Sequence, residues 1–248
     1  MKTISLILTS FLLLTFGYAQ KIEISFLASA GAYHYSGASA TGISSFYGSG
    51  GTPNQYYTNN PYGSKGGFSY GAGIQAQHVS KGGFITGLQA GYDVLRSAEN
   101  ITYVYPGYAY PDITPFNYLV ENAILVKGKT HLQNESINLS PYIGYRLKGK
   151  NISVDLMPGI DVAFNVSSYD KGKATGDDGT VYTTNNKRPD GPTDFRLKFG
   201  AAVNYKKWGI TASYAHGLTN FDKGMIGDGG PYIVHSELLQ FGITYRLF

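Results

Sequence analysis

Four histidines fall near the ends of predicted strands, where an imidazole could bind a metal ion or act as a general base. They are His34, His131, His216 and His235. Three of them, His34, His216 and His235, come from strands that become neighbours if the chain closes into a cylinder. Glu237 follows close by, so a metal site or a hydrolase centre is one interpretation. No short ligand-spacing motif accompanies these residues, which favours the alternative that they are polar residues at the rim of the fold.

The elements that must position these residues have the period of β-strands. The last twelve residues, 237–248, alternate large apolar side chains with glycine and polar ones, as a strand does when its two faces meet different surroundings. The same design recurs in seven earlier segments. The eight predicted strands lie at about residues 22–35, 68–77, 84–94, 131–147, 152–166, 195–205, 208–218 and 237–248.

The connections between these strands alternate between long and short. Tight turns are predicted at residues 81–83, 148–150 and 206–207, and the long connections cover about residues 36–67, 97–130, 167–193 and 219–234. We expect a short hairpin at about 118–126 and, because 167–193 has no apolar periodicity, a mobile loop there. Long loops at one end and tight turns at the other are typical of a barrel that crosses the outer membrane.

The volume of the interior decides which face points inward. Eight strands enclose a lumen that side chains only just fill, whereas each predicted strand carries roughly five large apolar residues on one face. The opposite face, rich in glycine, serine and amides, fits. A soluble barrel or sandwich with an apolar interior is therefore disfavoured. The sequence predicts an all-β fold, an eight-stranded antiparallel up-and-down transmembrane β-barrel with a closed, plugged lumen, whose first and last strands pair because lipid tolerates no open sheet edge.

Charged residues on the predicted inner face balance in number, four acids against four bases. They are Glu23, Asp93, Asp155, Asp161, Arg146, Arg196, Lys198 and Arg246. Unpaired charges in a narrow interior are costly, so we expect salt bridges across the lumen, with Arg146 and Asp155 as diagonal neighbours near a turn. Aromatic residues near strand ends are expected to form girdles at the membrane surfaces. These are Tyr33, Tyr35, Tyr70, Tyr92, Tyr205, Trp208 and Tyr214.

The composition excludes several classes of protein. The chain has 248 residues and no cysteine, which rules out disulfide-stapled folds, thiol enzymes and cysteine-ligated metal centres. A net charge of +4 without a basic run gives no sign of nucleic-acid binding. Residues 1–19 have the pattern of a secretory signal peptide, with an apolar run shorter than the ~20 residues of a membrane-spanning helix. We therefore expect export, and residues 20–248 as one barrel domain in the outer membrane of a Gram-negative bacterium.

The C-terminal strand resembles the closing-strand signal of bacterial outer-membrane barrels. The signal is carried by Gln240, Gly242, Tyr245 and Leu247, and the chain departs from it in ending one residue later, at Phe248. The resemblance implies recognition of this strand by the barrel assembly machinery. It also implies membrane lipids, including lipopolysaccharide, as surroundings.

The segment Tyr214-Ala-His-Gly-Leu-Thr-Asn220 carries two further resemblances. His216 and the residues after it are similar to the His-x-Ser-Asn stretch of the outer-membrane lipid A deacylases, but Thr219 comes three residues on and would lie on the opposite face of a regular strand. The segment more closely resembles the aromatic-Gly-Leu-Thr-Asn run of the PorT-like outer-membrane β-barrel family of Bacteroidetes, and the whole mature chain has the layout of eight-stranded OmpA and OmpX barrels. Here His216 replaces the usual aromatic residue.

The PorT-like resemblance implies a non-enzymatic barrel, because members of that family are not enzymes and some are tied to type IX secretion. We therefore expect a structural or interaction component of the cell envelope, with a protein partner in a larger complex and no catalytic, cofactor-binding or metal-binding residues. Two alternatives remain open, a lipid A-modifying hydrolase and a small-solute channel.

Overall fold

The computed structural model describes residues 21–48, 55–106, 123–222 and 232–248, and the predicted signal peptide lies outside them. Eleven strands occupy the described part of the chain. They are β1 (Lys21–Ser36), β2 (Ile43–Gly48), β3 (Tyr56–Thr58), β4 (Lys65–Val79), β5 (Phe84–Tyr105), β6 (Ile124–Lys148), β7 (Ile152–Gly176), β8 (Val181–Arg188), β9 (Asp194–Tyr205), β10 (Trp208–Gly217) and β11 (His235–Arg246). No helix within these ranges is long and apolar enough to cross a membrane.

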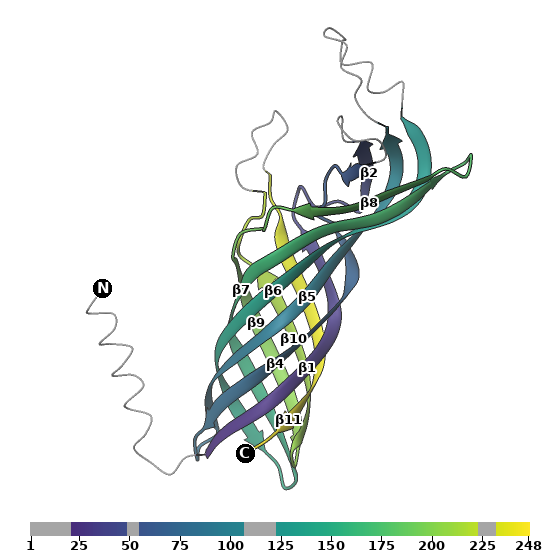
Figure 1. Ribbon diagram of the computed structural model, residues 1–248. Helices are drawn as coiled ribbons and strands as arrows, with labels where there is room; N and C mark the ends of the chain where they lie inside the picture. Colours follow the sequence, from purple (N-terminus) through teal and green to yellow (C-terminus); the bar gives the residue numbers. More distant parts are fainter. Residues whose placement is uncertain (1–20, 49–54, 107–122, 223–231) are drawn as a thin grey trace.

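Eight of the strands form a closed ring, in the order β5-β4-β1-β11-β10-β9-β7-β6, and β6 returns to pair with β5. Every neighbour in the ring is antiparallel. The first and last strands pair along most of their length, from Ser25 opposite Arg246 to Ser36 opposite His235. All eight predicted strands are therefore present, and the predicted closure of β1 on β11 is confirmed. Figure 1 shows the tilted strands of the ring.

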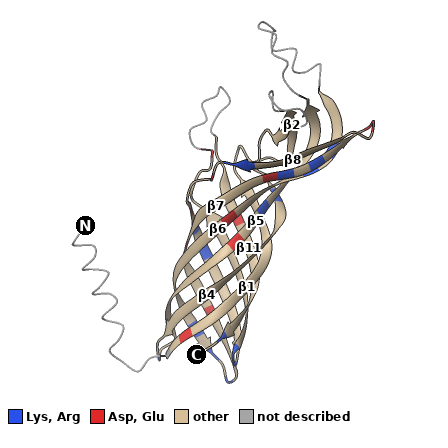
Figure 2. Ribbon diagram, viewed as in Figure 1, with Lys and Arg blue, Asp and Glu red and all other residues tan. Residues whose placement is uncertain are grey.

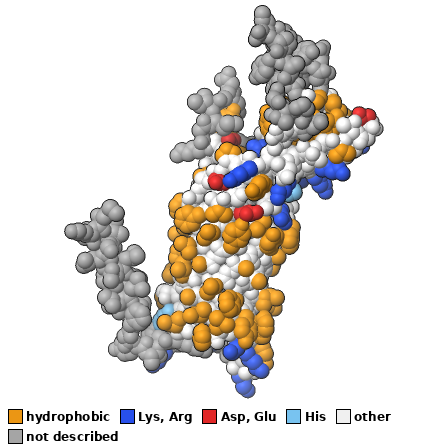
Figure 3. Space-filling view, viewed as in Figure 1, with side chains coloured by type: hydrophobic (Ala, Val, Ile, Leu, Met, Phe, Trp, Pro, Cys, Tyr) orange, Lys and Arg blue, Asp and Glu red, His pale blue; other side chains and the backbone are white. Residues whose placement is uncertain are grey.

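The apolar face of the ring points outward. Leu156, Phe199 and Ile243 are 38%, 53% and 56% exposed, whereas Glu23 and Asp161 on the opposite face are 2% and 1% exposed. Figure 3 shows the resulting belt of apolar side chains around the barrel. In water this belt would cost free energy in proportion to its area, but against acyl chains it costs nothing. The prediction of an apolar exterior is confirmed.

Three strands run far beyond the ring. β5 has 22 residues and β6 and β7 have 25 each, about twice the 9–11 that a strand needs to cross a bilayer. Their ends combine with β2, β3 and β8 into what we call the upper sheet, which has the strand order β3-β2-β5-β6-β7-β8. In Figure 1 it leans away from the barrel axis.

The upper sheet curls until its outer strands β3 and β8 meet through side chains. The guanidinium of Arg188 and the side-chain amide of Asn186, both on β8, donate hydrogen bonds to the carbonyls of Thr58 and Tyr56 on β3. This curl encloses a second apolar core away from the ring. Its buried members are Phe46, Tyr56, Ile101, Val104, Val126, Ala174 and Tyr182.

The predicted loops need correction at this end of the molecule. Residues 167–193 do not form a mobile loop, because β7 continues to Gly176 and returns as β8. Strands β2 and β3 lie within the predicted loop 36–67, and β5 and β6 both enter the predicted loop 97–130. The predicted hairpin at 118–126 falls largely outside the described residues, and its last three residues begin β6. The face of this part of β7 that turns inward carries small and polar residues, so no apolar period marks it.

Candidate functional site

The lower end of the lumen is crossed by a network of buried ion pairs. Arg146 donates hydrogen bonds of 2.9 and 2.8 Å to the two carboxylate oxygens of Glu23, and of 2.7 Å to each oxygen of Asp155. Arg246 lies 3.1 Å from Glu23, and Asn204 donates a 3.0 Å bond to Asp155. The predicted Arg146–Asp155 pair is confirmed, although the two residues are direct rather than diagonal partners. Bidentate geometry of this kind is the strongest form of an ion pair.

A second network lies nearer the upper end. Arg196, the largest fully buried side chain, lies 3.3 Å from Asp161 and 3.0 Å from Asp194. Ser140 and Ser236 donate 2.6 Å bonds to these two carboxylates. The Arg196–Asp161 pair joins two residues that the sequence places on the inner face. Asp194 was missed, although it has the same parity along its strand as Arg196.

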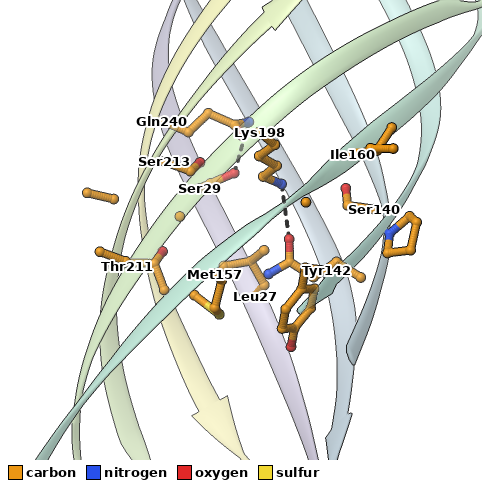
Figure 4. Close-up of a pocket in the computed structure, with 16 residues that line it drawn as sticks. Leu27, Ser29, Ser140, Tyr142, Met157, Ile160, Lys198, Thr211, Ser213 and Gln240 are labelled. Carbon is orange, nitrogen blue, oxygen red and sulfur yellow. Dashed lines mark hydrogen bonds between the residues drawn. The ribbon is translucent and has the colours of Figure 1, made fainter. Parts of the chain in front are cut away.

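Between the two networks the remaining predicted charges bond to amides instead of to each other. Asp93 accepts hydrogen bonds from Asn138 at 2.6 Å and Gln240 at 3.3 Å, and Lys198 donates a 3.0 Å bond to Gln89. The expectation of salt bridges is therefore wrong for these two charges. Figure 4 shows Lys198 and Gln240 directed into the hollow that this layer surrounds.

Tyr142 fills the interior just below this layer. A Cβ atom on Gly87 would lie 2.3 Å from the Tyr142 ring, so the ring packs over a glycine that leaves room for it. Its hydroxyl donates a 2.8 Å bond to Gln77, which in turn bonds to Glu23 in the lower network. Polar side chains thus connect one wall of the barrel to the other at several heights.

Two residues of the predicted aromatic girdle also lie inside. Tyr33 and Tyr35 are 1% exposed and pack against Leu95, Leu132 and other apolar residues at the upper end of the lumen. Their assignment to the girdle is wrong, because on β1 they share the parity of the inner-face residue Glu23. The other five predicted girdle residues are exposed on the outside. These are Tyr70, Tyr92, Tyr205, Trp208 and Tyr214.

The histidines of strands β1, β10 and β11 come together as predicted. Glu237 is the direct cross-strand partner of His34 on one side and of His216 on the other. His216 Nδ1 lies 2.7 Å from the Glu237 carboxylate, and the rings of His216 and His235 are 6.0 Å apart. His131 lies elsewhere, in the upper sheet. No group of three or more potential metal ligands occurs in residues 21–48, 55–106, 123–222 and 232–248.

His216 and Thr219 have separate hydrogen-bond partners. Its carboxylate partner Glu237 also accepts hydrogen bonds from Tyr214 and Ser36. The hydroxyl of Thr219 accepts a 3.0 Å bond from the backbone N–H of Phe195 and donates a 3.1 Å bond to a backbone carbonyl. A nucleophile must instead be within hydrogen-bond reach of its base. In this arrangement the threonine hydroxyl ties the segment that follows β10 to the start of β9.

The interior of the upper sheet holds a polar cluster that the sequence did not reveal. Asp170 accepts hydrogen bonds from the Thr58 hydroxyl at 2.7 Å and the Thr130 hydroxyl at 3.0 Å, and pairs with Arg188 at 3.0 Å. Glu99 is 2% exposed in the same interior. Burial raises the pKa of Glu99 to about 8, and the nearby Asp170 adds to this shift.

The outside of the upper sheet carries a group of exposed apolar side chains far from the barrel. Their exposed fractions lie between 40% and 57%. We call this group the aromatic zone, and its residues are Ile43, Tyr57, Tyr103, Leu125 and Val181. Tyr103 and Leu125 are direct cross-strand neighbours within this group. Exposed apolar side chains that gather on a sheet outside the membrane mark a contact surface more often than scattered single residues do.

Taken together, the closed ring, the apolar belt and the polar interior define an outer-membrane β-barrel. The chain belongs to the family described as outer membrane protein beta-barrel domain, whose model matches residues 18–223. No curated protein matches the sequence.

Among solved structures, the similarity is one of general layout. Ail of Yersinia pestis, crystallised with the heparin analogue sucrose octasulfate, is 12% identical over 93% of this chain and 100% of that chain, with a TM-score of 0.34. Neisserial surface protein A is 13% identical over 90% and 96%, with a TM-score of 0.34. The toluene transporter TodX of Pseudomonas putida is 10% identical over 94% and 90%, with a TM-score of 0.25. At such low scores, none of the three supports an inference about function.

Proposed function

We propose that this barrel is a non-enzymatic interaction component of the cell envelope and that its upper sheet docks a protein partner. The observation that carries the proposal is the upper sheet itself, which has its own apolar core and an exposed aromatic zone. A sheet that served only to connect barrel strands would not need either. Large, rigid aromatic side chains supply contact area at a low cost in conformational entropy.

The buried side chains inside the ring support this proposal over a solute channel. The Arg146 and Arg196 networks and the Tyr142 layer cross the interior at successive heights, so passage of a solute would require breaking buried ion pairs. We therefore propose a closed barrel. Porin-sized conductance of the purified protein in a planar bilayer would contradict this part of the proposal.

A site-specific photo-crosslinking experiment in intact cells tests the docking surface. A photoreactive amino acid placed at Tyr103 or Val181 in the aromatic zone should give one discrete adduct with another protein. The same group at Leu139, which is 40% exposed on the lipid-facing wall, serves as the matched control and should give none. The adduct from Val181 should disappear when Tyr103 and Leu125 are both changed to serine. If no adduct forms at any of these positions, the proposal is contradicted.

Three finer assignments complete the proposal. The Tyr214–Asn220 segment supports placement among the PorT-like barrels, with the partner being part of a larger outer-membrane complex such as a secretion system. Residues 1–19 would direct export. The C-terminal strand would be the element that the barrel assembly machinery recognises, and its full pairing between β1 and β10 makes it the strand that closes the ring.

A further inference from the structure

The outer face of β6 changes character abruptly at Glu135. From Leu147 to Ile137 every second residue on this face is apolar, and from Glu135 upward every second residue is polar or charged until Leu125. The neighbouring strand β7 makes the same change across a bulge, where the pairing register shifts between Glu135 and Ser136. The face that meets acyl chains below Glu135 therefore continues without a break into the face above it. The first residues above the change lie at the height of lipid head groups.

The face above the change is strongly cationic. Its basic residues on β6, β7 and β8 are Lys127, Lys129, His131, Lys171, Lys173 and Lys187. None of these five lysines lies within 4.0 Å of a carboxylate in the part of the chain that the structure describes. Asp177 and Asp178 lie in the turn at the far tip of the β7–β8 hairpin, Asp170 is buried, and Glu135 on β6 lies at the lower boundary of the face. Figure 2 shows Lys and Arg along this sheet.

Basic residues on this face are direct cross-strand neighbours. Lys129 pairs with Lys173, and His131 pairs with Lys171. Two like charges in such a pair, as in Lys129 and Lys173, have Cβ atoms within about 4.5–5.5 Å and are destabilising without a counter-charge. Lys129, Lys173 and Thr183 form one row across three strands. His131, Lys171 and Asn185 form the next row. The two rows together line an open hollow on this face.

The lean of the upper sheet directs this face toward the membrane. In Figure 3, blue side chains gather on the lower side of the leaning sheet, directly above the apolar belt. A cationic surface in that position meets the head groups of the surrounding outer leaflet before it meets bulk solvent. Each lysine near an anionic membrane surface contributes about 1 kcal/mol of attraction.

We propose that this cationic face is a binding site for phosphate groups carried by the lipid of the surrounding leaflet. Lys129, Lys171 and Lys173 supply the charge, and Thr183 and Asn185, the neighbours of the two β7 lysines on β8, supply neutral hydrogen-bond donors. The site holds the upper sheet against the membrane surface. It is separate from the aromatic zone, so either proposal can fail while the other holds.

The pKa of His131 reports on the same site. Burial lowers it, and the neighbouring positive charges of Arg96 and Lys171 lower it further. A bound phosphate would offset these charges and raise the pKa of His131. Asp170, which acts in the opposite direction, is on the inner side of the sheet and is already paired with Arg188.

Native mass spectrometry of the full-length folded barrel in detergent, titrated with diphosphoryl lipid A, tests the proposal. The triple variant K129Q/K171Q/K173Q should bind about ten- to a hundred-fold more weakly than the natural chain. The matched control K81Q/K150Q/K207Q removes the same charge at the opposite end of the barrel and should bind as the natural chain does. The triple Lys→Arg variant should retain binding, because it keeps the charge.

Other results would overturn the site. Equal binding by the Gln triple and the natural chain, or equal binding of lipid A stripped of its phosphates, would exclude phosphate recognition. If inorganic pyrophosphate binds as tightly as lipid A, the site binds free anions and is not a lipid site.

Folding of each variant is checked by circular dichroism. If the Gln triple does not fold, K173Q alone should weaken binding several-fold relative to K207Q, and equal binding by these two would exclude the site. Addition of lipid A should also raise the pKa of His131 measured by NMR, and an unchanged pKa would place the lipid elsewhere.

Discussion

The barrel ring and the upper sheet share three long strands, β5, β6 and β7, yet the faces of these strands are used in opposite ways in the two regions. In the ring, β6 turns Ser136, Asn138 and Ser140 inward and apolar residues outward. In the upper sheet, the same strand turns Val126 inward and lysines outward. The inner and outer faces of the sheet do not change, but the solvent outside it does. A continuous sheet therefore reverses its pattern where lipid gives way to water.

The largest expected effect comes from breaking the ring's interior. Replacing Arg146 with methionine keeps much of its volume but leaves Asp155 buried without a cation, and leaves Arg246 as the remaining cation beside Glu23. Unpaired buried charges of this kind cost about 3–5 kcal/mol. Urea unfolding of the refolded barrel in lipid vesicles should show this loss of stability. A change below about 1 kcal/mol would mean that water reaches these carboxylates.

The outer faces are compared by placing the same charge in each region. Ile143 and Val181 are similarly exposed, 56% in the ring and 51% in the upper sheet. Ile143→Lys puts a charge near the middle of the apolar belt, which should destabilise the barrel by about 2–4 kcal/mol. Val181→Lys should change stability by less than about 0.5 kcal/mol, because this side chain already faces water. Equal effects in the same unfolding assay would remove the distinction between the two faces.

The interior of the upper sheet should respond to pH, and the direction follows from Glu99. Its folded pKa of about 8 lies above the usual value of 4.5, so the folded sheet holds this proton more tightly than the opened sheet. The contribution is fully present below the unfolded pKa and is lost as the pH rises through the folded pKa. Between pH 6 and 8 the free energy of opening should fall by about 2–3 kcal/mol.

Hydrogen exchange of the β5, β6 and β7 amides in the upper sheet measures this opening. Amides of the ring serve as the internal control, and their protection should not follow the same pH dependence. In Glu99→Gln the dependence should disappear, because the amide does not titrate. Persistence of the same slope in that variant would assign it to another group.

The ring could be predicted from the sequence because each of its strands alternates large apolar residues with small or polar ones over many residues. The upper sheet could not, since Asp170, Gly172, Ala174 and Gly176 on the inner face of β7 are not large apolar residues and give no apolar period. Their core comes mainly from other strands, through Phe46 and Ile101. Neither residue lies within a strand as the sequence predicted it.

The candidate sites could be predicted where their residues lie close together in the sequence. Arg146 and Asp155 flank a tight turn, so their pairing follows from the register of one hairpin. Glu99 becomes part of a site only through strands far away in the sequence, whereas Asp194 lies two residues from Arg196 on the same strand. Tyr33 and Tyr35 were assigned by residue type instead of by parity. Counting from Glu23 along the strand would have placed both tyrosines inside.

The reversal of the strand faces at Glu135 is tested most directly by spin labels along β6. The chain has no cysteine, so single cysteines can be placed at each odd position from 125 to 147 and labelled in a lipid bilayer. We predict that labels from 137 to 147 are accessible to dissolved oxygen and shielded from a water-soluble nickel reagent, and that labels from 127 to 131 show the opposite preference. Labels at 137 to 147 that are shielded from both reagents would mean that the apolar face is packed inside protein and would contradict the account.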